Sequence, residues 1–295
     1  MLGSRFDNLV ARPFRDRRQQ RALGQHMRLL DNPAGRLRVY DSGGNKPALL
    51  LAPDGPCVIE HFLALIAGLE RDFRVVCFDM PGFGFSFHRA GFGFGVAETA
   101  DAVAALLDTL GIARAAIAFS CANGFVALAL AQRHPARVSH LVLSQTPSGE
   151  AMDAWSALNI PPFLHLPVLG QAAMLAAKKT FSRTWFDAAL PRHSPLKADI
   201  AGQAHAAVCR GGCFSLASLV QGMARSALDS GQPVQCPVLA IHGGLDYSHR
   251  FTDFQSIRKS APQAQVLGFA DCGHCPDLED SPRFVQVVGE FLSAP

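Results

Sequence analysis

The stretch FSCANGFVAL, residues 119–128, joins a short apolar run to a longer helical pattern. The run Ala115–Phe119 is apolar throughout, which is typical of a strand covered on both faces. Phe125–Arg133 has apolar residues at helical spacing. The residues between these two segments therefore connect a buried strand to a helix.

The same alternation of apolar runs and helical patterns extends along the chain on both sides of this stretch. Val96–Leu110 has helical spacing. Near the N-terminus, Met27–Leu30 and Leu37–Tyr40 flank the turn-forming residues 31–35, which predicts an antiparallel hairpin. The alternation indicates an α/β fold with a mostly parallel sheet wrapped by helices. The other predicted strands are Ala48–Ala52, Arg74–Phe78, His140–Ser144, Pro237–His242 and Gln265–Phe269.

The alternation stops between about residues 149 and 232, where large apolar side chains lie among prolines and helix-forming residues. This composition predicts an inserted helical cap, or lid, over residues 149–232. The α/β core then comprises residues 27–148 and 233–295. Residues 1–26 form a basic N-terminal arm, which we expect to be solvated. The arginines of this arm are Arg5, Arg12, Arg15, Arg17, Arg18 and Arg21.

Composition excludes several classes of protein. The chain has 295 residues, of which 49% are hydrophobic and 17% charged, and its formal net charge is +3. This balance gives no basic face for nucleic acid outside the arm. No apolar run reaches the ~18–20 residues that a membrane span needs. The arm lacks the apolar centre of a secretion signal, so we expect a cytoplasmic protein.

Eight cysteines raise the question of a disulfide or metal framework. In a chain of this length without a secretion signal, free thiols in a reducing compartment are expected. Cys272 and Cys275 have CxxC spacing, but one such pair without a second is weak evidence for zinc. The sequence therefore predicts no metal site and no cofactor.

Three segments taken together resemble the α/β-hydrolase family, over nearly the whole chain from about residue 27. DMPGFGFS at 79–86 is similar to the family's turn after an early strand. FSCANGFVAL aligns without a gap to its strand, nucleophile turn and helix. Gly273-His274, followed by Glu279, Pro282 and Phe284, is similar to its histidine loop and C-terminal helix. The resemblance implies an α/β-hydrolase fold with a mostly parallel central sheet, flanking helices and an inserted helical cap.

The gap-free alignment places Cys121 at the nucleophile position, which most members of the family fill with serine. A thiolate paired with histidine is strongly nucleophilic, and a nearby helix N-terminus lowers the thiol's pKa. Phe119 and Asn123 stand where the family has glycine, which leaves the geometry of the turn open. Shifting the turn by one residue makes Ser120 the alternative nucleophile, with small residues on both sides but one extra residue before the helix.

The resemblance also implies the partners of this nucleophile. His274 stands where the family keeps its general base, and Asp246 stands where its acid orients that histidine. The chain order of nucleophile, acid and base is that of the fold. The expected oxyanion donors are the backbone N–H groups of Ala122 and Asp54, with Gly55 as the neighbouring alternative to Asp54. The role of the Asp54 side chain stays open.

These residues imply a hydrolase of the esterase or thioesterase type, EC class 3.1. It would act on an ester, lactone or thioester of an apolar or aromatic acyl compound, through an acyl intermediate on Cys121. A carrier-bound thioester is a further candidate partner, and nucleic acid is not expected. Two alternatives stay open: acyl transfer or cyclisation from the same intermediate, and a non-catalytic ligand-binding protein on a hydrolase scaffold.

Overall fold

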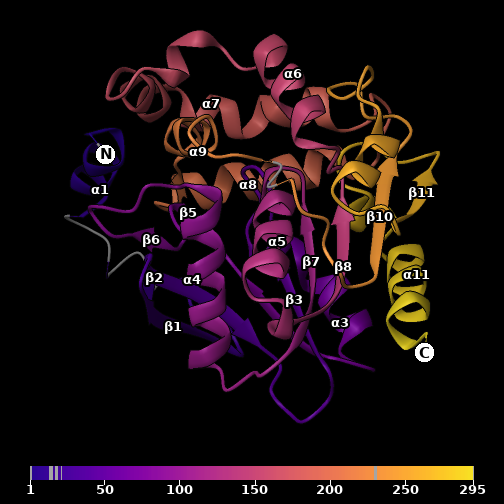
Figure 1. The fold of residues 1–295 in the computed structure, drawn as a ribbon. Helices are drawn as coiled ribbons and strands as arrows, with labels where there is room; N and C mark the ends of the chain where they lie inside the picture. Colours follow the sequence, from indigo (N-terminus) through magenta and orange to yellow (C-terminus); the bar gives the residue numbers. More distant parts are fainter. Residues whose placement is uncertain (1, 13–15, 17–18, 21, 229–230, 295) are drawn as a thin grey trace.

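The computed structural model describes residues 2–12, 16, 19–20, 22–228 and 231–294. Its strands are β1 (Met27–Asn32), β2 (Gly35–Asp41), β3 (Ala48–Ala52), β4 (Arg74–Phe78), β5 (Phe83–Gly84), β6 (Phe87–His88), β7 (Ala115–Ser120), β8 (Val138–Ser144), β9 (Cys213–Phe214), β10 (Val238–Gly243) and β11 (Gln265–Phe269). The main sheet has the order β1-β2-β4-β3-β7-β8-β10-β11, and β6 pairs with β2 (Figure 1). From β4 to β11 in this order the strands are parallel, whereas β1 and β2 are antiparallel to their neighbours. The predicted α/β class is thus confirmed.

Helices cover both faces of this sheet. Residues of α4 and α5 pack on one face, and residues of α3 and α11 on the other. The helices of the described residues are α1 (Leu2–Ala11), α3 (Leu63–Leu69), α4 (Val96–Thr109), α5 (Ala122–Arg133), α6 (Gly149–Asn159), α7 (Leu169–Ala189), α8 (Lys197–Cys209), α9 (Leu216–Met223), α10 (Pro276–Glu279) and α11 (Ser281–Ser293). Short 3₁₀ turns are η2 (Ile59–Phe62), η3 (Pro135–Arg137), η4 (Pro162–His165) and η5 (Phe254–Lys259). Among the described residues, no helix is both long enough and apolar enough to cross a membrane.

The sheet separates two buried cores, because successive residues of a strand point to opposite faces. Leu50 of β3 packs in the core that includes residues of α4 and α5. Its neighbours Leu49 and Leu51 pack in the core that includes residues of α3 and α11. All three side chains are buried, which explains why the strands appear in the sequence as continuous apolar runs.

The hairpin of β1 and β2 follows from its turn residues. Asn32 Oδ1 accepts a hydrogen bond of 2.9 Å from Ala34 N–H, an Asx turn that reverses the chain. Gly35 has φ 149°, and a Cβ there would lie 2.1 Å from the carbonyl oxygen of Phe87. Only glycine allows β6 to approach β2 this closely. The predicted antiparallel pairing is confirmed.

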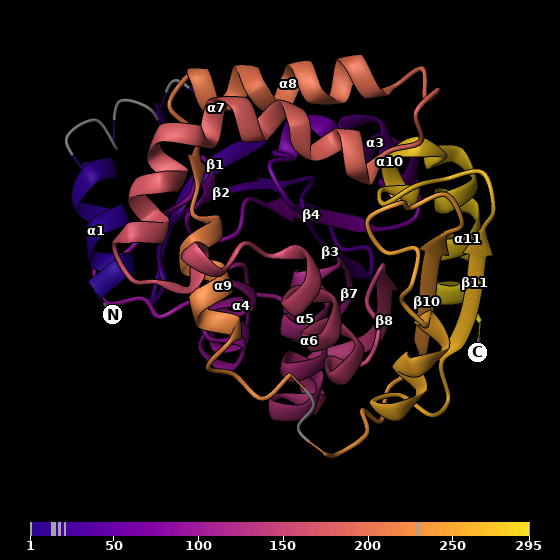
Figure 2. The same cartoon turned by 90° about the horizontal axis from the view of Figure 1, so that it is seen from above.

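The segment between β8 and β10 contains the helices α6, α7, α8 and α9. Figure 1 shows α6, α7 and α9 beyond the carboxyl ends of the parallel strands, and Figure 2 looks down on this end of the sheet. The short strand β9 from this segment pairs with β5, which lies in the loop after β4. The segment from α6 to β9 is therefore joined to the edge of the sheet where the strands end.

The expectation of a solvated N-terminal arm is wrong for residues 2–11, which form the packed helix α1. Asn8 Nδ2 donates to the carbonyl of His88 at 2.6 Å, and Asp7 accepts a bond of 2.7 Å from Ser218 in α9. Small residues, Gly3 and Ser4, form the buried face of α1 and let it pack closely. Of the arginines assigned to the arm, Arg15, Arg17, Arg18 and Arg21 lie outside the described residues.

Candidate active site

Cys121 occupies the turn between β7 and α5. Its backbone has φ 50° and ψ −122°, a conformation that costs a non-glycine residue energy and is found at functional turns. Its side chain lines a cavity, and its N–H donates to the carbonyl of Ser144 at 2.7 Å. Ser120 is the last residue of β7, pairs with Ser144, and is not among the described residues that line this cavity. The structure therefore brings Cys121, and not Ser120, to the cavity.

The two departures from glycine are accommodated by the surrounding packing. Phe119 is buried and lies edge-to-face on Phe78, with ring centroids 5.9 Å apart. Asn123 donates from Nδ2 to the carbonyl of Pro53 at 3.3 Å, which ties the turn to the loop after β3. The backbone of α5 comes close to Thr146 one residue later, at Gly124, where a Cβ would lie 2.0 Å from Thr146 Oγ1. Gly124 thus lets α5 pack against the end of β8.

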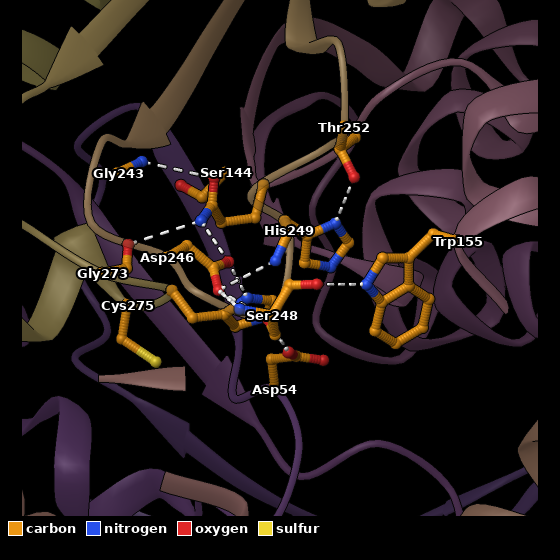
Figure 3. Close-up of polar contacts among 12 residues, drawn as sticks. Asp54, Ser144, Trp155, Gly243, Asp246, Ser248, His249, Thr252, Gly273 and Cys275 are labelled. Carbon is orange, nitrogen blue, oxygen red and sulfur yellow. Dashed lines mark hydrogen bonds and ion pairs between the residues drawn. The ribbon is translucent and has the colours of Figure 1, made fainter. Parts of the chain in front are cut away.

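Asp246 and His274 meet through a short hydrogen bond. His274 lies in the loop between β11 and α10, and its Nδ1 lies 2.6 Å from Oδ2 of Asp246, which follows β10 (Figure 3). The N–H of His274 donates to the carbonyl of Ala189 at 2.7 Å, which anchors the loop to the end of α7. The Nδ1–H tautomer or the imidazolium is therefore fixed, with Nε2 on the opposite side of the ring.

Asp54 completes the cluster on that opposite side. Its Oδ2 lies 3.3 Å from Nε2 of His274 (Figure 3). One ligand atom each from Asp54, Cys121 and His274 lies within 4.8 Å of the other two. Ala122 also lines the cavity, and as the first residue of α5 its N–H has no acceptor within its own helix. All five residues of the predicted site thus come together, with Ser120 outside the cavity.

The charges of this cluster favour a protonated imidazole. Burial alone would lower the pKa of His274, but Asp246 and Asp54 together raise that pKa well above its ordinary value. Burial, with the charge of Asp54 beside it, raises the pKa of the Cys121 thiol. The N–H of Ala122 at the start of α5 does lower this pKa, as expected, but desolvation outweighs that contribution and the net shift is upward. Ionisation of Cys121 is opposed by Asp54 and assisted by His274.

Several supporting residues escaped the sequence analysis. Gln145, directly after β8, donates from Nε2 to Oδ2 of Asp246 at 2.6 Å, and Ser248 N–H donates to Oδ1 at 2.9 Å. Trp185 of α7 lies edge-on to His274, with ring centroids 5.3 Å apart. Gln145 could have been predicted from its position at the carboxyl end of a predicted strand, whereas no sequence pattern pointed to Trp185.

His249 is a buried histidine beside the cluster. Its ring stacks on that of Trp155 in α6, with ring centroids 4.5 Å apart (Figure 3). It also stacks on the ring of His274, with centroids 5.3 Å apart. Burial, together with the charge of His274, lowers the pKa of His249 to about 3, so its ring is neutral. Trp155 Nε1 also donates to the carbonyl of Ser248 at 2.8 Å. Helix α6 is thus joined to the loop that carries Asp246.

The cavity in front of Cys121 has a volume of about 790 Å³. Its lining is mostly apolar and aromatic and comes from the loops at the sheet edge and from α6, α7 and α9. A volume of this size suits a small organic molecule with a polar end at the cluster. The principal apolar lining residues are Met80, Phe83, Met152, Trp155, Phe181, Trp185, Phe214, Leu219 and Met223.

Comparison with known proteins agrees with this geometry. A family model described as the alpha/beta hydrolase fold matches residues 47–162. The 2-hydroxymuconate semialdehyde hydrolase of Pseudomonas sp. strain CF600 is 28% identical over 88% of this chain and 90% of its own length. The 2-hydroxy-6-oxo-2,4-heptadienoate hydrolase of Pseudomonas putida is 25% identical over 87% of this chain and 92% of its own.

Solved structures share the fold. Epoxide hydrolase A from Mycobacterium thermoresistibile superposes with a TM-score of 0.78 at 18% identity, over 90% of this chain and 97% of that one. A meta-cleavage product hydrolase from Pseudomonas fluorescens IP01 gives a TM-score of 0.68 at 22% identity, with the same two coverages. The sheet order, the family match and these solved structures together show that the chain has the α/β-hydrolase fold.

Proposed function

We propose that this α/β-hydrolase cleaves an ester, lactone or thioester of an apolar or aromatic acyl compound, with Cys121 as nucleophile. The observation that supports this most is the position of Cys121 at the strained turn, facing the cavity within 4.8 Å of His274 and Asp54. In this proposal His274 is the general acid and base, and Asp246 orients its ring and stabilises the imidazolium.

The reaction starts from a thiolate at Cys121 beside a protonated His274. The thiolate attacks the acyl carbon, and the oxyanion that forms accepts hydrogen bonds from the N–H groups of Ala122 and Asp54. His274 gives its Nε2 proton to the leaving alcohol or thiol, which departs and leaves an acyl-thioester on Cys121. Water then gives a proton to His274 and its oxygen to the acyl group, which restores the thiolate and releases the acid.

We propose that the Asp54 side chain stabilises the imidazolium of His274 and does not contact the oxyanion. A carboxylate beside a developing oxyanion would repel it, but Oδ2 of Asp54 lies against Nε2 of His274. In that position its charge stabilises the protonated ring between the two halves of the reaction. The backbone N–H of the same residue stays available for the oxyanion.

We further propose that residues 149–232 are the cap that selects the substrate. Trp155, Phe181 and Trp185 come from α6 and α7 and line the cavity, so an aromatic or long apolar acyl group would pack against them. A thioester on a carrier would enter with its acyl end in this cavity. Transfer of the acyl group to an alcohol or amine would use the same intermediate.

A second candidate function comes from the relatives. Their names describe hydrolases of 2-hydroxymuconate semialdehyde and of a 2-hydroxy-6-oxo-dienoate, and each match spans nearly nine-tenths of this chain. Such substrates carry an aldehyde or keto carbonyl for attack by Cys121, and a carboxylate. The guanidinium of Arg250, an exposed residue that lines the same cavity, suits that carboxylate. In this case a carbon–carbon bond next to that carbonyl would be cleaved.

Turnover of a substrate panel tests the proposal. The panel contains an aryl ester, an aryl thioester, a lactone and a 2-hydroxy-6-oxo-dienoate, each offered to wild type, His274→Ala and Ser120→Ala. We expect hydrolysis of at least one oxygen or thioester substrate, a loss of about 10³-fold or more in His274→Ala, and near-normal turnover in Ser120→Ala. Turnover of the dienoate alone would support the second candidate. No turnover of any compound would support the non-catalytic alternative, whereas equal turnover in wild type and His274→Ala would contradict the role proposed for His274.

A further inference from the structure

The cluster at the cavity floor has the composition of a metal site. Asp54, Cys121 and His274 offer a carboxylate oxygen, a sulfur and a ring nitrogen within 4.8 Å of one another, and all three residues line the cavity. Thiolate, imidazole and carboxylate are the three ligand types that Zn²⁺ uses in proteins. We propose that these three side chains bind Zn²⁺, and that the bound ion reversibly blocks the enzyme.

The distance between the His274 and Asp54 ligand atoms fits a bound Zn²⁺. Two ligand atoms that are each about 2.0–2.1 Å from a tetrahedral Zn²⁺ lie about 3.3 Å from each other. Nε2 of His274 and Oδ2 of Asp54 are 3.3 Å apart. The imidazole and the carboxylate therefore need little movement to bind one ion. Sγ of Cys121 lies within 4.8 Å of both atoms, compared with the ~3.6 Å that tetrahedral bonds of about 2.3 Å to sulfur and 2.0–2.1 Å to nitrogen or oxygen would set.

The outer partners of His274 are those of a zinc-bound histidine. A histidine that binds zinc through one nitrogen usually donates its other N–H to a carboxylate, which fixes the ring and strengthens it as a ligand. Here Nδ1 lies 2.6 Å from Oδ2 of Asp246, and the same carboxylate oxygen accepts a bond of 2.6 Å from Gln145. Nε2 is thereby directed to the place where the ion would lie.

Charge and access to the cavity favour metal binding by Asp54, Cys121 and His274 over a second group of possible ligands nearby. The thiolate and Asp54 together carry two negative charges, which neutralise a divalent cation in a largely buried place. The second group of possible ligands is Asp246, His249 and His274. Asp246 and His249 do not line the cavity in the described part of the chain, and the oxygens of Asp246 already accept from Gln145 and Ser248. An ion there would have to break these bonds.

The cavity leaves the fourth coordination position free for water, as in zinc sites with three protein ligands. The ion binds the Cys121 thiolate and the unprotonated Nε2 of His274, so any proton on these two atoms is released to solvent, while Nδ1 keeps its proton toward Asp246. Affinity should therefore rise with pH. The ion binds both the Cys121 sulfur and the His274 nitrogen that the proposed hydrolysis needs, and it would therefore inhibit the enzyme. The inhibition rests on the proposed function, whereas the binding rests on the geometry alone.

Cd²⁺ is the probe for this site, because it replaces Zn²⁺ and its bond to a thiolate gives an ultraviolet charge-transfer band. Metal-free full-length protein is titrated with Cd²⁺, and Zn²⁺ is then added as a competitor. We expect one equivalent of Cd²⁺ to give the band, Zn²⁺ to remove it, and EDTA to reverse both. Cys121→Ser should abolish the band, and Asp54→Asn should weaken binding by about 10-fold or more while the band remains at high Cd²⁺.

The chain offers a matched control in a second cysteine–histidine pair. Cys209 Sγ lies 3.4 Å from Nε2 of His205 on α8, and both residues are away from the cavity. Cys209→Ser should leave the band and its Cd²⁺ affinity unchanged. Loss of the band in Cys209→Ser, or a band that persists in Cys121→Ser, would overturn the proposal.

Activity measurements separate this proposal from the proposed function. If the metal-free enzyme hydrolyses its substrate through Cys121 but gives no band with Cd²⁺, the zinc site is refuted and the function stands. If the band forms at Cys121 but no substrate is turned over, the site is supported and the function fails. Where both hold, Zn²⁺ should inhibit turnover with the affinity that it shows in the Cd²⁺ competition.

Discussion

Nε2 of His274 lies 3.3 Å from Oδ2 of Asp54, although the two residues are 220 positions apart in the chain. The parallel sheet brings them together, because the loop after β3 and the loop after β11 leave the same edge. The ring is consequently held between two carboxylates, Asp54 and Asp246. This arrangement stabilises the imidazolium and at the same time opposes ionisation of Cys121.

Asp54→Asn should therefore lower the pKa of the Cys121 thiol. The carboxylate charge raises that pKa, so removing the charge while keeping the backbone N–H shifts the pH midpoint of Cys121 alkylation downward, by on the order of one pH unit. The measurement is the rate of labelling by iodoacetamide as a function of pH. Asp153→Asn, which changes a carboxylate elsewhere in the cavity lining, is the control. An unchanged or raised midpoint in Asp54→Asn would contradict the assignment.

Gly124→Ala should destabilise the protein by about 1–3 kcal/mol, because the new methyl group overlaps the Thr146 side chain where α5 meets β8. The control is Gly202→Ala in α8, where a Cβ meets nothing within 4 Å. That substitution should stabilise the helix by up to about 1 kcal/mol. Urea unfolding of both variants measures the difference. Equal stabilities would show that the turn at Cys121 does not depend on a close approach of α5 to β8.

Arg38→Met should cost about 3–5 kcal/mol of unfolding free energy. Arg38 is fully buried, donates from Nε to Asp79 at 2.8 Å and binds Glu60 through both terminal nitrogens. Removing it leaves Asp79 as an unpaired buried carboxylate. Arg28→Met breaks an ion pair with Asp41 whose arginine is half exposed, and should cost less than about 1 kcal/mol. A similar loss in both variants would contradict the role given to Arg38.

Asp277 makes stability depend on pH. Burial raises its pKa to about 7, so between pH 4 and pH 7 the folded protein keeps a proton that the unfolded chain has lost. This group therefore favours folding most at low pH, and its contribution decreases as the pH rises toward 7. Asp277→Asn removes the ionisation and should flatten this part of the stability–pH curve. Thermal unfolding at pH 5 and pH 8 is the measurement, and an unchanged pH difference would refute the prediction.

The sequence predicted the sheet and the main members of the cluster, because both depend on local patterns. Apolar runs between helical patterns located the strands, and the residues at their carboxyl ends, Cys121, Asp246 and His274, met as parallel topology requires. The helix α1 was missed because its buried face consists of small residues such as Gly3 and Ser4, which give no hydrophobic pattern.

The electrostatic balance of the cluster could not be predicted from local patterns. The family resemblance pointed to Cys121, and its place before a helix predicted a lowered thiol pKa. The net shift of that pKa depends on burial and on the carboxylate of Asp54, both of which are set by tertiary packing. The stack of Trp155 on His249 likewise joins segments from α6 and the loop after β10. Neither residue has a spacing that distinguishes it from ordinary core side chains.

The acyl intermediate itself tests the central claim most directly. The enzyme is mixed with the best substrate of the panel, quenched in acid within the first turnover, digested and analysed by tandem mass spectrometry. We predict an acyl group on Cys121 that neutral hydroxylamine removes, as it does a thioester, and that is absent in Cys121→Ala. An acyl group on Ser120, or full turnover in Cys121→Ala, would contradict the account.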